Sequence, residues 1–191
     1  MMNKYINLAI TFCVLFTLAS CCNCSNEEQT FASDDLEWIP DGDIGDSVVF
    51  INADGEEKIF YIRVMEQYIS EVKCAGPCFC NCPEENTGYY DFQFTGEEIP
   101  NTLGIREGIT INLIKTNNMV QKTFTWSCPY GSFQDFDYSI DTITVRNKLY
   151  HNVFVKEMDV CNIRKIFYCK GIGLIRFDYD DGTWELNGGT R

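Results

Sequence analysis

Short apolar runs separated by turn-forming residues dominate the chain from residue 47 onward. Val, Ile, Phe and Tyr fill the runs, whereas Gly, Asp and Asn separate them. β-branched and aromatic side chains favour strands, and the separating residues favour tight turns. We therefore expect strands over 47–52, 58–64, 109–115, 119–126, 141–145, 150–156, 164–169, 174–179 and 183–186.

The segments between these runs are short enough to be hairpin turns. Asp54-Gly55 is a strong signal, because both residues tolerate a positive φ. Further turns are expected at 116–118, 146–148 and 181–182, and a turn at 38–43 opens the domain. Since tight hairpins join antiparallel neighbours, we expect a mainly β fold. It would be one antiparallel domain over 38–191, either an incompletely closed barrel or a sandwich.

One stretch, RVMEQYISEV over 63–72, fits two structures. Met65, Ile69 and Val72 recur at helical spacing, which is typical of an amphipathic helix. The same residues also continue the preceding strand, and we favour that interpretation.

The N-terminus has the order of a secretory signal peptide. Lys4 precedes an apolar stretch from Ile6 to Ala19, and a small residue follows. The stretch is shorter than the roughly 20 apolar residues that span a bilayer, and it contains polar residues. We therefore expect residues 1–20 to be removed as a signal peptide; a retained transmembrane anchor is the alternative.

The sequence Leu18-Ala19-Ser20-Cys21 resembles a bacterial lipobox. The resemblance implies that Cys21 is lipidated and becomes the first residue of the mature chain. Each buried lipid methylene contributes about 0.8 kcal/mol, and more than one acyl chain gives a durable anchor. Residue 22 is Cys and not the Asp that marks inner-membrane retention, which favours the outer membrane.

The residues after Cys21 are polar and acidic, so residues 21–37 are expected to form a lipidated flexible tether. The pair Glu27-Glu28 resembles a surface-export signal of Bacteroidota-type lipoproteins. A charged spacer is the simpler alternative, and outward display on the cell surface stays open.

The formal net charge of the chain is −13 at pH 7. Nucleic-acid binding requires a basic face that neutralises phosphates, so this composition opposes it. Anionic lipid headgroups would also be repelled. We therefore expect no nucleic-acid partner, and contact with the membrane through the N-terminal lipid alone.

The segment CAGPCFCNCPEE concentrates four thiols around Gly76-Pro77: Cys74, Cys78, Cys80 and Cys82. An exported chain meets conditions in which disulfides form. Of the 11 cysteines, Cys13 leaves with the leader and Cys21 is lipidated, which leaves an odd number. The spacing differs from the C-x2-C pattern of zinc sites, and no histidine accompanies it.

Three interpretations of the thiols therefore remain. We favour disulfides, in which Cys74 or Cys78 pairs with Cys82 or with a later cysteine. Incidental free thiols are the second interpretation, and capture of Cu(I) or zinc by thiolates is the third. The possible disulfide or metal residues are Cys74, Cys78, Cys80, Cys82, Cys128, Cys161 and Cys169.

Catalytic chemistry has little support in the sequence. His151 is the only histidine and lies in LYHNVFVK, where a half-exposed strand position explains it. Histidine-based triads and the common zinc sets are therefore disfavoured. Carboxylates are plentiful enough for a paired-acid glycosidase, but no pair stands out. No phosphate-binding GxxxxGK[ST] motif is present, and we expect no cofactor.

Two other patterns have a structural and a functional interpretation. Residues 178–182, DYDDG, are similar to a calcium loop, but the spacing is broken and a hairpin turn fits better. Tyr89, Tyr90, Phe92 and Phe94 could form a sugar-stacking platform. Alternation within a core strand is the simpler explanation.

The C-terminal half carries a family resemblance. ITVRNKLYHNVFVKEM and RKIFYCKGIGLIRFDYDDGTWEL are similar to the endings of small Bacteroidota-type surface lipoproteins, and 170–174, KGIGL, is the sharpest element. The opening WIPDGDIGDSVVFINADGEE is similar to their start. The family is largely uncharacterised, so the resemblance implies a β-rich lipoprotein and no reaction. Gly171 and Gly173 suit a bend or a close approach of another backbone.

Together these features predict an outer-membrane-anchored lipoprotein of the cell envelope. We expect a non-enzymatic binding or structural component whose ligand the sequence does not identify. A glycan-active hydrolase using two carboxylates is the first alternative. Thiol-based metal capture by the 74–82 segment is the second.

Overall fold

A computed structural model describes residues 30–70, 87–98, 106–116, 119–126, 131–160 and 162–188. Cys21, the 74–82 segment, Cys128 and Cys161 lie outside the described residues. The described part contains strands and turns and no helix. The strands are β1 (Ser47–Ile51), β2 (Glu57–Ser70), β3 (Thr87–Glu98), β4 (Arg106–Thr116), β5 (Met119–Trp126), β6 (Gly131–Phe133), β7 (Tyr138–Val145), β8 (Lys148–Val160), β9 (Ile163–Cys169), β10 (Gly173–Tyr179) and β11 (Gly182–Leu186).

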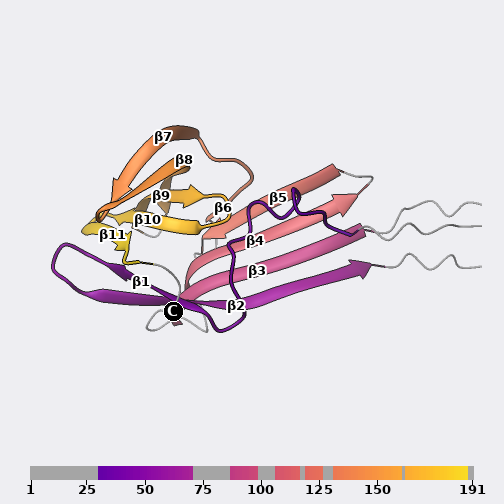
Figure 1. Cartoon of the computed structure of the whole chain (residues 1–191), viewed down its shortest axis with the longest axis horizontal. Coiled ribbons are helices and arrows are strands. Elements are labelled where there is room, and N and C mark those ends of the chain that lie inside the picture. The colour runs from indigo at the N-terminus through magenta and orange to yellow at the C-terminus, as the bar shows by residue number, and fades with distance from the viewer. Residues whose placement is uncertain are drawn as a thin grey trace, which may run out of the picture.

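All eleven strands form one sheet in the order β6-β5-β4-β3-β2-β1-β11-β10-β9-β8-β7. Neighbours are antiparallel, and each neighbouring pair is consecutive in the chain except β1 and β11. In Figure 1 the long strands β2–β5 extend from one end, and β7–β11 lie at the other. Because β6 and β7 are the two edges of the described sheet, it is not closed. The predicted mainly β, antiparallel fold is confirmed, and the open sheet is consistent with an incompletely closed barrel or a sandwich.

The predicted strands appear with small changes of their ends. β2 runs through Arg63 to Ser70, so the helical alternative is wrong for this described part. The core strand expected from the aromatic alternation is β3, although its full length was not predicted. The three-residue strand β6 was not predicted at all, because so short a segment carries no periodicity.

The turns explain why these neighbours pair. Asp54-Gly55 joins β1 to β2, and Gly55 has φ +83°. The turn between β7 and β8 consists of Arg146 and Asn147, both with positive φ. A two-residue turn with positive φ, such as Arg146-Asn147, matches the twist of the strands that it joins. The 52–56 connection between β1 and β2 is longer, and most of the sheet is a series of local hairpins.

The concave side of the curled sheet is filled by aromatic rings. Phe50 lies between Phe60 and Phe177, with ring centroids 5.1 Å from each. Trp126 of β5 reaches Phe177 of β10 across the interior at 5.5 Å. Full burial of one such side chain contributes roughly 1.5–3 kcal/mol. The interior is therefore a packed core.

Residues 30–37, which were expected to belong to the tether, pack on the sheet. Phe31 and Leu36 contact the core, and the Phe31 ring meets Tyr90 edge-on at 6.0 Å. Lys115 donates hydrogen bonds to the Asp35 carboxylate at 2.7 Å and to the Thr30 carbonyl oxygen at 2.8 Å. The part of the chain that packs on the sheet thus begins before residue 38.

A membrane-spanning helix of sufficient length and apolar character is not found among the described residues.

The N-terminal segment also forms hydrogen bonds with the Lys-Gly-x-Gly turn between β9 and β10. The Gly171 amide donates to the Glu37 carbonyl at 2.9 Å, and the Asp41 amide donates to the Gly171 carbonyl at 3.1 Å. Gly173 has φ +93°, and a Cβ there would lie 2.6 Å from Cγ of Pro40. The expected bend is confirmed by the positive φ of both glycines, whereas the group that lies close to Gly173 is the Pro40 side chain and not another backbone.

Candidate functional site

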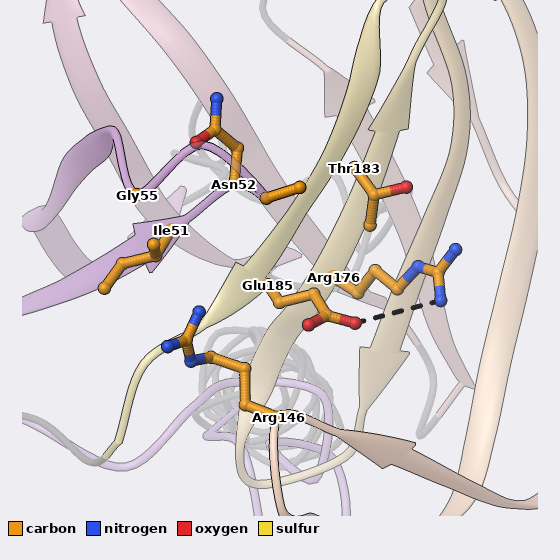
Figure 2. A pocket seen from close by; sticks show the side chains of 8 residues that line it. Ile51, Asn52, Gly55, Arg146, Arg176, Thr183 and Glu185 are labelled. Carbon is orange, nitrogen blue, oxygen red and sulfur yellow. Dashed lines mark ion pairs between the residues drawn. The ribbon is translucent and has the colours of Figure 1, made fainter.

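An open groove of about 480 Å³ lies where three distant parts of the chain meet. Its floor comes from β10 and β11, one wall from the end of β1 and its turn, and the other wall from the β7–β8 turn. Figure 2 shows this groove, which we call the arginine groove. Its lining residues are Ile51, Asn52, Ala53, Gly55, Arg146, Arg176, Thr183 and Glu185.

Arg146 reaches the groove because the β7–β8 hairpin folds back over the sheet. Three strands separate β7 from β11 in the sheet order, yet Arg146 lines the groove beside Glu185 of β11. Figure 1 shows the β7–β8 turn near β10 and β11. Asn152, with φ +51°, interrupts the extended backbone of β8. Asparagine tolerates this conformation, so the hairpin can change direction there.

The conformation of Arg146 itself is unfavourable. Its φ of +51° lies in the left-handed region, which costs an L-residue other than Gly, Asn or Asp roughly 1–2 kcal/mol. Its side chain is exposed, and its guanidinium has neither an ion pair nor a hydrogen bond with any described residue. The turn thus holds, at the rim of the groove, a cation that pairs with no other part of the described structure.

Arg176, in contrast, is fixed on the groove floor. Its guanidinium donates to both carboxylate oxygens of Asp178, at 2.9 and 3.1 Å, and lies 4.0 Å from Glu185. It also stacks on Phe167, with its Cζ 4.8 Å from the ring centroid. In Figure 2, Glu185 lies between the side chains of Arg146 and Arg176.

The opposite wall is a turn with its own internal hydrogen bonds. The Asn52 side-chain oxygen accepts from the amides of Asp54 and Glu56, at 3.1 and 2.9 Å. Its side-chain nitrogen donates to the Glu56 carboxylate at 2.7 Å. This wall is therefore preformed, as small-molecule sites usually are.

The lining groups of the groove can form ion pairs and hydrogen bonds. Two guanidinium groups can bind an anion, while Glu185 accepts and Thr183 accepts or donates hydrogen bonds. Glu185 is the only carboxylate among the lining residues. Glycoside hydrolysis with two acids needs a second carboxyl group at roughly 5–9.5 Å across the substrate, and the lining does not supply it.

A second open groove, of about 270 Å³, is rich in aromatic residues, of which Tyr138 is exposed and Trp38 is packed within the fold. Trp38 is stacked on Phe136 at 5.6 Å and lies 6.2 Å from Tyr168. The ammonium groups of Lys122 and Lys170 lie 5.2 and 4.5 Å from the Trp38 ring. The Trp38 ring therefore packs against aromatic rings and ammonium groups of the fold itself.

A polar cluster inside the sheet is also internally satisfied. Lys58 pairs with Glu107 at 2.7 Å, and the Tyr179 hydroxyl donates to the same carboxylate. Burial, together with the nearby Glu107 charge, raises the pKa of Tyr179 far above its usual range. Lys58 also lies 4.6 Å from the Trp184 ring centroid. This cluster stabilises the junction of β2, β4 and β10.

Among the predicted thiol residues, the structure describes Cys169. It is buried and free, and its Sγ lies 3.5 Å from the His151 carbonyl oxygen. Burial raises the pKa of the Cys169 thiol, which disfavours the thiolate that metal binding and disulfide exchange require. The described residues contain no cluster of three metal-binding side chains.

The remaining sequence candidates have structural positions. His151 is exposed on β8 opposite Thr142. In the 178–182 segment, Asp178 pairs with Arg176 and Asp180 with Arg164, so both carboxylates are engaged in a hairpin. Tyr90, Phe92 and Phe94 are buried in the core. Tyr89 alternates to the other face of β3, where it is half-buried and stacks on the exposed Tyr68 at a centroid distance of 5.0 Å.

The residues of the arginine groove were not singled out from the sequence. The one available signal was an arginine in a two-residue turn that favours Asn or Gly. No family model, curated protein or solved structure matches this chain.

Proposed function

We propose that the protein is an outer-membrane lipoprotein whose β domain is a non-enzymatic binding module, with the arginine groove as its binding site. The observation that carries the proposal is the groove itself. It is open, has a preformed wall and a fixed floor, and presents at its rim a guanidinium that has no partner within the described ranges. It has one lining carboxylate, which supports binding over hydrolysis.

The lipobox at Cys21 supplies the anchor in this proposal. Few residues separate Cys21 from Thr30, where the described structure begins. The domain would therefore be held close to the membrane surface. The acidic composition would keep the domain itself off the anionic headgroups.

The anchor is tested by fractionating cells that express the full chain or Cys21→Ala. The full chain should be recovered with the outer membrane, and the variant should lose that association. Recovery of both proteins in the same fraction would contradict the anchor.

The binding site is tested with the full chain purified in detergent and an array of neutral and acidic oligosaccharides. We expect retention of ligand without the appearance of new reducing ends. Thr183→Trp, which fills the groove, should abolish retention, whereas Thr144→Trp on the exposed side of β7 should not. New reducing ends, or equal retention by both variants, would contradict a non-enzymatic groove.

A further inference from the structure

We infer that the arginine groove recognises a carboxylated sugar, with Arg146 binding the carboxylate and Glu185 accepting hydrogen bonds from hydroxyl groups. The inference rests on the proposed function and names the ligand class of the same site.

The anionic part of the ligand follows from the charges. Arg176 is neutralised locally by Asp178 and faces Glu185, whereas the Arg146 guanidinium has no partner among the described residues. The planar guanidinium matches a carboxylate with two parallel hydrogen bonds. Arg146, Arg176, Asp178 and Glu185 carry two positive and two negative charges, so the site offers one guanidinium without an ion pair among the described residues and no net positive charge.

The same charges favour a carboxylate over a phosphate. A phosphate monoester carries about −1.5 to −2 charges at pH 7. Glu185 would repel such a dianion, since its carboxylate lines the same groove. A ligand with a single negative charge can reach Arg146 while the rest of the ligand lies against Glu185.

The neutral part of the ligand follows from the other lining groups. Glu185 and Thr183 accept hydrogen bonds, as hydroxyl groups require, and Ile51 and Ala53 offer small apolar surfaces. The lining contains no aromatic ring, which disfavours a flat aromatic acid. The volume of about 480 Å³ lies within the range of small-molecule sites.

To test this, the full chain in detergent micelles is titrated separately with sodium D-glucuronate, D-glucose and inorganic phosphate. Saturation-transfer NMR of the two sugars measures their binding. Glucuronate should bind about tenfold more tightly than glucose, which lacks the carboxylate. Phosphate at equal concentration should displace little glucuronate.

Three variants locate the interaction. Arg146→Asn keeps a residue that tolerates the left-handed turn and removes the guanidinium, so glucuronate affinity should fall about tenfold, to that of glucose. Lys148→Gln removes one positive charge at the start of β8 and should leave the affinity unchanged. Glu185→Gln should raise phosphate binding by removing the repulsion.

Several results would overturn the inference. They are the absence of glucuronate binding, equal affinities for glucuronate and glucose, an unchanged glucuronate affinity in Arg146→Asn, or displacement by phosphate at equal concentration. If oligosaccharides are retained in the array and lost in Thr183→Trp, the proposed function stands even when this inference fails.

Discussion

The Lys115 ammonium lies 2.7 Å from the Asp35 carboxylate, although 80 residues separate them in the sequence. Lys115 is 9% exposed. The hydrogen bond from Lys115 is the main cause of the lowered pKa of Asp35, and the hydrogen bond from the Ala32 amide lowers this pKa further. This pair fastens the segment before β1 to strand β4.

We expect Asp35→Asn to destabilise the protein by about 1.5–3 kcal/mol at pH 7, because it removes a hydrogen bond between charged groups and leaves Lys115 without a counterion. The native pKa of Asp35 lies below its ordinary value of 3.8. The stabilisation is therefore present above that value and is lost as the pH falls through the native pKa.

Urea unfolding of both proteins at several pH values measures this difference. Asp34→Asn, at an exposed neighbouring carboxylate, is the control and should stay within about 0.5 kcal/mol of the parent protein. A difference for Asp35→Asn that is independent of pH would contradict the role of this pair.

Gly173→Ala should be more destabilising than Gly171→Ala. Both glycines have positive φ, but only the added Cβ at 173 meets a side chain, at 2.6 Å from Pro40. We expect about 1 kcal/mol for Gly171→Ala from backbone conformation, and about 1–3 kcal/mol more for Gly173→Ala from overpacking. Chemical denaturation measures both.

Pro40→Ala provides the check on this contact. In a double-mutant cycle, it should recover part of the cost of Gly173→Ala and none of the cost of Gly171→Ala. Equal costs for the two glycine variants would show that the Pro40 contact has no energetic weight.

Trp184→Ala should cost roughly 3–5 kcal/mol, as large-to-small core substitutions do. Trp184 is 8% exposed, stacks on Phe177 at a centroid distance of 6.3 Å and has the Lys58 ammonium over its ring. Thermal unfolding tests this against Leu149→Ala, whose side chain is 53% exposed. An unchanged melting temperature for Trp184→Ala would mean that this ring is not part of the core.

The Cys169 thiol should react slowly with iodoacetamide at pH 8 in the native protein and rapidly in urea. Burial protects it and raises its pKa, so little thiolate is available. Peptide mass spectrometry of differentially labelled protein gives both rates. Rapid native labelling, or a cross-linked peptide containing Cys169, would contradict the free buried thiol.

The local features of the fold could be predicted from the sequence. Asp54-Gly55 and the 146–148 segment each place a turn between two adjacent apolar runs, and such hairpins depend on neighbouring residues alone. The pairing of β1 with β11 could not be predicted in this way, because it joins strands from the two ends of the domain. The packing of Asp35 on Lys115 is equally non-local, which is why the expected tether was too long.

The arginine groove is even harder to predict from the sequence. The position of Arg146 beside Glu185 depends on a fold-back of the β7–β8 hairpin across three intervening strands. No sequence period encodes that contact. The residues that the sequence favoured, the thiols of 74–82, stand out by composition, but composition does not state which partners they reach.

If a lipid holds this β domain at the membrane, the mature N-terminal peptide must carry its mass, and mass spectrometry of that peptide measures it. We expect a chain that begins at Cys21, with a diacylglyceryl group on the thiol and an acyl group on the new amine. Cys21→Ala should retain the leader or be cut elsewhere. An unmodified wild-type N-terminus, or an intact leader on the wild-type chain, would contradict the claim.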